Sequence, residues 1–386
     1  MGVFLAHSEL GCEICFNLSS MKERCVALLG RRDEPTDAVE EYCHYLGAAL
    51  EAQEISFELE RIRWCELGWR KALAGMDRRV AHWKNDWVLI QYTALAWSRR
   101  GFPLRFLGLV RFLRKYGVRC GVVFHDAQPY YGSRLVDRAR RQLQIHTMRE
   151  AVRLADLAVL TTPPEKAQWL PAGAQNVVFI PVGANLPSPE TAWTKKKSGP
   201  ERPPTVAVFS LSQGRVGAEE VKAIVDGMRY VAKRIGAVRL VVFGRNAESA
   251  EKLLRESLHG MDVELILSGI LAAEAVVRAL GQSDVLLFAR GPISTRRGSA
   301  IAGIACGLPV VALEGWETAA PITEAGVVLT QPGEQFGPAL MRVLGDPAYR
   351  ERLAERSRMA QQSYFSWQAI AQRYSAALLG HGGARS

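Results

Sequence analysis

The stretch GPISTRRGSAIAGIACGLP, from Gly291 to Pro309, decides how the rest of this chain is interpreted. It begins as a loop of glycine, proline and serine that carries two adjacent arginines, Arg296 and Arg297. Small residues then predict a short helix, which Gly307 closes as its C′ residue before an apolar strand at 310–313. A helix N-terminus offers free backbone N–H groups and a positive dipole end, and a guanidinium beside it can bind a phosphate. The stretch therefore predicts an anion site, with an exposed loop of solvated arginines as the alternative.

Length and composition limit the fold and the partners. With 386 residues, 48% of them hydrophobic, the chain has room for at least two domains with separate cores. A formal net charge of +10 favours acidic partners such as nucleotide phosphates, an anionic membrane surface or nucleic acid. No apolar run is long enough to span a membrane, and charged residues interrupt the region where a signal peptide would need an apolar stretch. We therefore expect a cytoplasmic protein.

The cysteines indicate a reduced protein without a metal centre. Their number, seven, is odd for a long chain, so we expect buried thiols rather than disulfides. Cys12 and Cys15 have the spacing of half a zinc site, but no second pair of ligands follows at a suitable spacing. We expect neither a metal nor a cofactor.

Apolar strands alternate with helices along both halves of the chain. This alternation requires crossover connections and predicts an α/β fold with doubly wound parallel sheets. In the first half we predict strands at 25–29, 86–92, 121–124, 157–160 and 177–180, and helices at 38–53, 104–116, 133–154 and 165–170. In the second half we predict strands at 205–209, 240–243, 263–267, 284–288 and 310–313, and helices at 218–235, 272–280 and within 336–379.

Composition divides the chain into five parts. Residues 1–22 show no clear periodicity and are expected to form an N-terminal arm. The segment 188–204 is rich in proline and basic residues, and we interpret it as a linker. It separates a first domain at 23–187 from a second at 205–360, and a C-terminal helix at 361–386 is expected to cross back to the first domain.

Ligands of parallel sheets bind beyond the carboxyl ends of the strands. In the first half, Gly30–Asp37, Gln91–Arg99 and His125–Pro129 all follow strand ends. We therefore expect three loops that are distant in sequence to converge, with the main cleft between the two domains.

The order and spacing of several short motifs resemble a glycosyltransferase family. The motifs are HD at 125–126, RLADLAVLTTP at 153–163, IPVGANLP at 180–187, SDVLLFAR at 283–290 and AGIACGLPVVALEG at 302–315. Together they resemble GT-B glycosyltransferases of the retaining, nucleotide-sugar-dependent family 4 type, which includes many bacterial polysaccharide and glycolipid transferases. The resemblance covers most of the chain, from Cys25 to about Leu379.

The resemblance implies a fold and an activity. It implies two Rossmann-like domains facing across a cleft, the first binding the acceptor and the second a nucleoside diphosphate sugar. The implied reaction is a metal-independent hexosyl transfer to a glycan or a lipid-linked acceptor, with no cofactor besides the donor. Arginines and a helix end would then neutralise the leaving diphosphate where other folds use a divalent cation.

The chain departs from the family pattern at two places. Two glutamates common in the family correspond here to Ser294 and Ala302, and an Arg/Lys pair corresponds to Ser210 and Arg215. The usual carboxylate contacts to ribose and sugar hydroxyls are therefore in doubt. We expect the donor diphosphate to be bound by Arg215, Ser294, Arg296, Arg297, Gly298 and Ser299.

The remaining candidates follow from their places at strand ends. His125 can hydrogen-bond the transferred sugar, or its carbonyl can stabilise positive charge at the anomeric carbon, and Asp126 can act as a base or orient the histidine. Gly244 and Arg245 suit nucleotide contacts. Glu314 is the candidate for the missing carboxylate, and Glu317, on the other side of Trp316, is an alternative to it.

Three alternatives remain open at this stage. The departures at Ser294, Ala302 and Ser210 also suit a non-catalytic GT-B scaffold or regulatory protein. An inverting transferase with Asp126 as base is a second possibility. The helix at 104–116 carries bases and aromatics that suit peripheral contact with an anionic membrane, whereas nucleic acid is not expected because the known basic and aromatic modules are absent.

Overall fold

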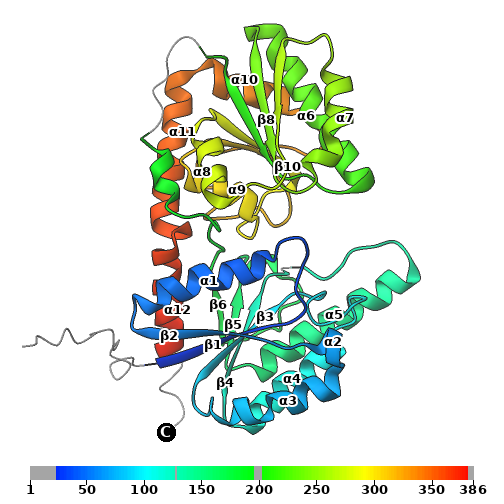
Figure 1. The fold of residues 1–386 in the computed structure, drawn as a ribbon, viewed down its shortest axis with the longest axis vertical. Coiled ribbons are helices and arrows are strands. Elements are labelled where there is room, and N and C mark those ends of the chain that lie inside the picture. Colours follow the sequence, from blue (N-terminus) through cyan, green and yellow to red (C-terminus); the bar gives the residue numbers. More distant parts are fainter. Residues whose placement is uncertain (1–22, 127, 195–201, 381–386) are drawn as a thin grey trace, which may run out of the picture.

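Two six-stranded parallel sheets, one in each half of the chain, form the framework of the molecule (Figure 1). The computed structural model describes residues 23–126, 128–194 and 202–380. The N-terminal sheet has the order β2 (Ile55–Arg61), β1 (Glu23–Leu29), β3 (Trp87–Tyr92), β4 (Arg119–Phe124), β5 (Leu157–Leu160), β6 (Val177–Phe179). The C-terminal sheet has the order β12 (Val327–Thr330), β11 (Val310–Leu313), β10 (Val285–Pro292), β7 (Thr205–Phe209), β8 (Val238–Phe243), β9 (Val263–Leu267). This confirms the prediction of two doubly wound parallel sheets.

Helices cover both faces of each sheet, as crossover connections require. The N-terminal sheet carries α1 (Ala38–Glu51), α2 (Trp64–Leu67), α3 (Trp69–Ala81), α4 (Leu104–Lys115) and α5 (Leu135–Leu154). The C-terminal sheet carries α6 (Gly214–Ile235), α7 (Ala247–Leu258), α8 (Ala273–Gly281), α9 (Gly298–Ala305), α10 (Phe336–Gly345) and α11 (Pro347–Ala360). Asp37 caps α1 through Oδ1, which accepts from the backbone N–H groups of Val39 and Glu40 at 3.1 and 3.2 Å.

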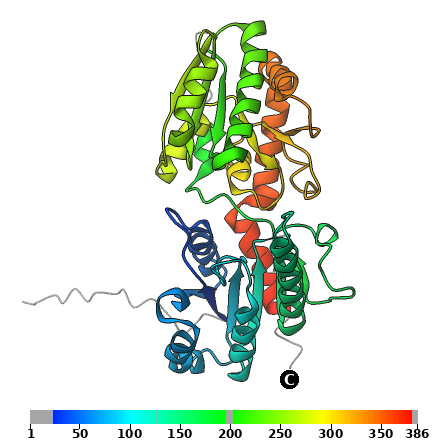
Figure 2. The same cartoon turned by 90° about the vertical axis from the view of Figure 1, so that its right-hand side faces the viewer.

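The last helix, α12 (Trp367–Gly380), lies against the N-terminal domain. Both views show it passing from the C-terminal domain down to the other domain, where it runs beside α1 (Figures 1 and 2). The buried hydroxyl of Tyr42 donates to the hydroxyl of Tyr374 at 2.9 Å. Trp367 Nε1 donates to the carbonyl of Ala184 at 2.7 Å. The end of the chain therefore joins the two domains a second time, in addition to the linker.

The segment between residues 54 and 85 contains elements that were not predicted from sequence: β2, α2 and α3. Strand β2 lies at the edge of the sheet, and only Ile55 among its residues is buried. An edge strand is covered on fewer sides than a central one, so it lacks the apolar run by which the buried strands are identified. The short helix predicted near 165–170 is instead a single 3-10 turn at Pro164–Lys166. Pro171 follows closely and disfavours a helical residue before it.

Helix α4 packs most of its apolar residues inside the domain. Phe106, Leu109, Val110 and Leu113 are fully buried. The apolar surface that suggested membrane contact for residues 104–116 is therefore part of the core. In the described part of the chain, none of the helices combines the length and the apolar character needed to cross a bilayer.

Some predictions concern residues that the structure does not describe. The N-terminal arm at 1–22, including Cys12 and Cys15, and the middle of the linker at 195–201 lie outside the described residues. The same holds for 381–386, at the end of the C-terminal segment.

Candidate functional site

The loop between β10 and α9 lies against the N-terminal domain. Ser294 and Thr295 in this loop are fully buried. Thr295 Oγ1 donates to the carbonyl of Thr161 at 2.7 Å, and the Thr295 carbonyl accepts from the Val182 N–H at 3.1 Å. These bonds across the domain interface fix the loop, and with it the N-terminus of α9.

A cavity of about 560 Å³ lies between the domains, in front of the α9 N-terminus. Its polar lining from the C-terminal domain comprises Ser210, Gly244, Arg245, Arg290, Arg296, Arg297, Gly298 and Ser299. Its apolar lining from the same domain comprises Phe209, Ile270, Leu271, Ala273, Val276, Phe288 and Ala302. The N-terminal domain contributes Asp33, Thr36, Ala38, Glu41, Tyr45, Asn185 and Leu186. The structure thus brings the predicted residues 244, 245 and 296–299 together around one space.

Two guanidinium groups in this cavity are set up for an anion. Burial lowers the pKa of Arg297 to about 10 and also lowers the pKa of Arg290. The Nε atoms of both are buried, and among the described residues neither has a hydrogen-bond acceptor. Buried polar groups normally have a partner, and a buried charge without one is costly. An anion in the cavity, close to the free N–H groups of α9, would supply the missing acceptors.

Arg296 differs from its neighbour because it already has a partner. Its Nε lies 2.7 Å from Glu317 Oε2, and its Nη2 lies 3.1 Å from Glu317 Oε1. Ser294 Oγ donates to the same carboxylate at 3.3 Å. Burial alone would raise the pKa of Glu317, but the hydrogen bond and charge of Arg296 outweigh it and lower this pKa. Glu317 is therefore a carboxylate held in ionised form beside Ser294, where the family that the sequence resembles has a glutamate.

His125 is neutral and firmly held. Its Nε2 lies 2.8 Å from Gln91 Oε1, and the Tyr42 ring contacts it edge-on at 5.1 Å between centroids. Because the side-chain amide of Gln91 donates through Nε2 to Leu89, its oxygen is left to accept from the histidine. Burial lowers the pKa of His125 to about 4. His125 lines neither the cavity between the domains nor the smaller cavity beside Asp126, so the structure places neither its imidazole nor its carbonyl against a ligand space.

Asp126 lines a second, smaller cavity of about 270 Å³ within the N-terminal domain. The three loops expected to converge do meet there: its lining includes Gly30, Asp37, Gln91, Thr93 and Asp126. Asp126 Oδ2 accepts from the Ala94 N–H at 2.7 Å. Burial raises the pKa of Asp126, and the positive charge of Arg296 opposes this rise. Asp126 of the N-terminal domain therefore interacts electrostatically with Arg296 of the C-terminal domain.

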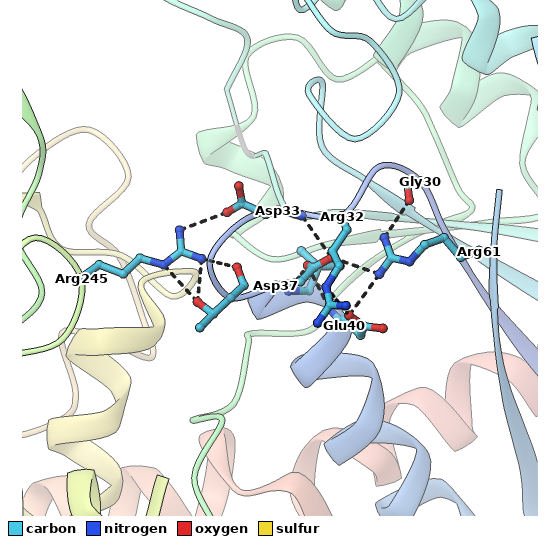
Figure 3. Close-up of polar contacts among 9 residues, drawn as sticks. Gly30, Arg32, Asp33, Asp37, Glu40, Arg61 and Arg245 are labelled. Atoms are coloured by element: carbon cyan, nitrogen blue, oxygen red, sulfur yellow. Dashed lines mark hydrogen bonds and ion pairs between the residues drawn. The ribbon is translucent and has the colours of Figure 1, made fainter. Parts of the chain in front are cut away.

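Arg245 contacts the N-terminal domain directly (Figure 3). Its Nε and Nη2 donate to Thr36 Oγ1 at 3.0 and 2.6 Å, Nη2 also donates to the Thr36 carbonyl, and Nη1 pairs with Asp33 at 3.1 Å. Behind this contact, Arg61 donates to the carbonyl of Gly30 and pairs with Asp37 at 3.1 Å, which supports the same loop (Figure 3). The residue predicted to bind a nucleotide thus bridges the two domains across the larger cavity.

The structure brings none of Arg215, Ser294 and Glu314 to either cavity, and Ser294 is fully buried. The Arg215 side chain is 93% exposed on α6 and pairs with Glu219 on the same helix. Glu314 accepts from Gln331 Nε2 at 2.5 Å. Arg215 follows a strand end in sequence, but α6 begins at Gly214 and carries its side chain outwards.

Sequence reasoning missed Arg290, and it named Glu317 only as an alternative to Glu314. Arg290 is the last residue of the motif SDVLLFAR, and a charged residue that ends a buried strand at its carboxyl end is a signal that could have identified it. Glu317 was an alternative to Glu314, and no local pattern separates the two. Only the packing of the 314–318 loop against Arg296 does so.

Comparison with known proteins shows the fold. No family model matches the chain, and no curated protein matches its sequence. HepE from Anabaena in complex with UDP aligns at a TM-score of 0.64 with 14% identity, covering 93% of this chain and 100% of that one. A glycosyltransferase from Rickettsia africae aligns at a TM-score of 0.64 with 12% identity, over 94% and 100% of the two chains.

The fold also occurs in a protein with another assigned activity. A Listeria monocytogenes protein provisionally assigned as a UDP-N-acetylglucosamine 2-epimerase aligns at a TM-score of 0.59 with 15% identity, over 94% and 97% of the two chains. At these identities the likeness concerns the fold alone. The chain has the GT-B fold, two Rossmann-like domains facing across a cleft.

Proposed function

We propose that the protein is a glycosyltransferase that moves a sugar from a nucleoside diphosphate sugar to an acceptor. The observation that carries the proposal is the pair of partly buried arginines, Arg290 on β10 and Arg297 at the N-terminus of α9, whose Nε atoms are buried without an acceptor among the described residues and which line the same cavity. Two positive charges with free backbone donors match a diphosphate, and the apolar residues of the lining suit a nucleobase. UDP is the first nucleotide to test, because HepE binds it.

The same groups support a reaction without a metal. As the bond between sugar and diphosphate breaks, negative charge grows on the leaving phosphate, and arginines held in a water-poor cavity stabilise that charge. We propose that this replaces a divalent cation. We further propose that the sugar keeps its anomeric configuration, as the family resemblance implies; an inverted product would instead assign Asp126 as a general base.

The smaller cavity favours transfer over epimerisation. An epimerase acts on its nucleotide sugar alone, whereas a transferase needs a place for a second substrate. The cavity beside Asp126 is about 270 Å³ in volume, and its largely apolar wall carries polar groups of Asp37, Gln91, Thr93 and Asp126, which suits a sugar unit. We propose that a glycan or the sugar of a lipid-linked acceptor binds there, with its reacting hydroxyl towards Arg296 and Glu317.

We also propose that the protein works in the cytoplasm, where nucleotide sugars are made. Cys25, Cys43 and Cys306 are buried thiols, which suits a reducing compartment.

Calorimetry with UDP, GDP and ADP, followed by turnover of the corresponding nucleotide sugars, tests the proposal. Binding of one nucleotide together with acceptor-dependent release of that nucleotide is the expected result. Binding without turnover under any acceptor would point to the scaffold role suggested by Ser294 and Ala302, and absence of binding to all three would remove the proposal.

A further inference from the structure

One surface of the N-terminal domain combines exposed apolar side chains with many arginines. It consists of residues 98–105 and 128–142, and we name it the basic apolar face. Tyr131, Leu135 and Val136 on it are 78%, 81% and 50% exposed. Single exposed apolar residues are ordinary, but several large ones close together mark an interaction surface.

Side-chain contacts join the two segments into one surface. Gln144 Nε2 donates to the carbonyl of Gly101 at 2.8 Å, and Gln144 Oε1 accepts from the Tyr130 N–H at 2.6 Å. Arg140 Nε donates to the carbonyl of Arg100 at 3.0 Å, and its guanidinium lies 4.6 Å from the centre of the Tyr130 ring. The loop before α4 and the loop before α5 therefore present one continuous face.

The charge of this face has one sign. The two segments contain seven arginines and one acidic residue, Asp137. Asp137 is buried and pairs with Arg140 at 2.9 Å, so it does not offset the outer arginines. Arg134, the N-cap residue of α5, and Arg138 in its first turn are exposed, close in sequence to Leu135. The face therefore presents exposed guanidinium groups next to exposed apolar side chains.

We propose that the basic apolar face docks on the surface of an anionic lipid bilayer. Arginines at a bilayer surface bind lipid phosphates, while leucine, valine and tyrosine side chains enter the boundary between headgroups and acyl chains. Nucleic acid offers phosphates but nothing for the aliphatic tips of Leu135 and Val136. The face is separate from the donor cavity, and its docking does not depend on the proposed transfer reaction.

The position of the face agrees with a membrane-bound acceptor. The start of α5 and the loop before it lie at the outer edge of the N-terminal domain, on the right in Figure 1. That loop follows directly on His125 and Asp126 in the sequence. Of the segment 104–116, for which membrane contact was considered from sequence, only the start of α4 belongs to this face, because α4 uses most of its apolar residues in the core.

Sedimentation with lipid vesicles tests the proposal. The full chain is mixed with vesicles of phosphatidylcholine alone or with about 30% phosphatidylglycerol. We expect binding to the anionic vesicles only, weakened by salt. The double variant Arg134→Glu with Arg138→Glu should reduce the partition coefficient at least about 25-fold, since each basic residue near an anionic leaflet contributes about fivefold. Tyr131→Ser with Leu135→Ser should reduce it at least about tenfold.

Matched variants on the C-terminal domain serve as controls. Lys222→Glu with Lys252→Glu changes the same amount of charge, and Leu253→Ser with Met359→Ser removes exposed apolar side chains of the other domain. Both controls should bind vesicles as the wild type does.

Equal losses in controls and face variants, or full binding by the Tyr131/Leu135 variant, would overturn the proposal. Calorimetry with UDP on the same samples keeps the two proposals apart, because a failure of vesicle binding leaves nucleotide binding unchanged.

Discussion

Arg296 holds the carboxylate of Glu317 at two points, with Nε 2.7 Å from Oε2 and Nη2 3.1 Å from Oε1. The pair lies beside Ser294, where the family that the sequence resembles has a glutamate. A carboxylate thus lies next to this position, although it belongs to a residue 23 positions further along the chain. Arg296 lines the donor cavity, and the charges of Arg296 and Glu317 act in opposite directions on the pKa of Asp126 in the smaller cavity.

The Glu317→Gln variant should separate transfer from nucleotide binding. The amide cannot form the charged pair, so Arg296 loses its fixed position, while Arg290 and Arg297 remain in place. We expect the transfer rate to fall about tenfold or more, since a hydrogen bond to a charged group contributes about 1.5–3 kcal/mol. UDP affinity, measured by calorimetry, should change little. A variant with full transfer activity would show that the pair has only a structural role.

Removal of either buried arginine should weaken donor binding. Arg290→Ala and Arg297→Ala each delete a charged contact to the diphosphate, and we expect UDP affinity to fall by roughly 10- to 100-fold. Arg215→Ala is the matched control, because that side chain is 93% exposed and paired with Glu219. Calorimetry that shows the largest loss for Arg215 would place the diphosphate near the start of α6 instead.

The contact of Arg245 with Thr36 can be tested from both domains. Thr36→Val removes the Oγ1 acceptor without altering the C-terminal domain, whereas Arg245→Ala removes the whole contact. If the contact serves to hold the domains together, both variants should lower the transfer rate and leave UDP affinity nearly unchanged. A loss of UDP affinity in Arg245→Ala alone would assign the side chain to the nucleotide.

The hydrogen bond between Tyr42 and Tyr374 should stabilise the return of α12 to the N-terminal domain. Tyr374→Phe leaves the buried Tyr42 hydroxyl without its acceptor, at a cost of about 1–3 kcal/mol in unfolding free energy. The double variant Tyr42→Phe with Tyr374→Phe removes both polar groups and should be less destabilised than the two single losses added together. Strictly additive losses in urea unfolding would contradict the bond.

His125 should make the protein sensitive to acid. Its pKa is lowered from 6.5 to about 4, so the folded state favours the neutral imidazole. The contribution of the neutral imidazole to the free energy of unfolding is fully present above pH 6.5. It is lost as the pH falls towards 4, because the unfolded chain then binds the proton more readily than the folded one. Between neutral pH and mild acid, His125→Gln should lose about 2 kcal/mol less stability than the wild type. Parallel stability curves in urea unfolding would refute this assignment.

The sequence alone determined the architecture and part of the site. Buried apolar runs that alternate with helices leave parallel sheets as the way to pair the strands, and the structure confirms two of them. The stretch Gly291–Pro309 identified a loop followed by a helix N-terminus, and Arg297 and Gly298 line the cavity there. These inferences succeed because they depend on local periodicity and on the backbone chemistry of a helix end.

Tertiary structure decided which charged residues share the site. Arg290 enters the cavity, Arg215 faces solvent, and Glu317 rather than Glu314 meets Arg296. Arg245 could be placed at a strand end from sequence, but its contact with Thr36 could not, because it lies across the interface between domains. Periodicity reports how each residue is buried within its own element. The distance between side chains of different elements depends on strand order, loop path and domain packing, which the pattern of a single segment does not contain.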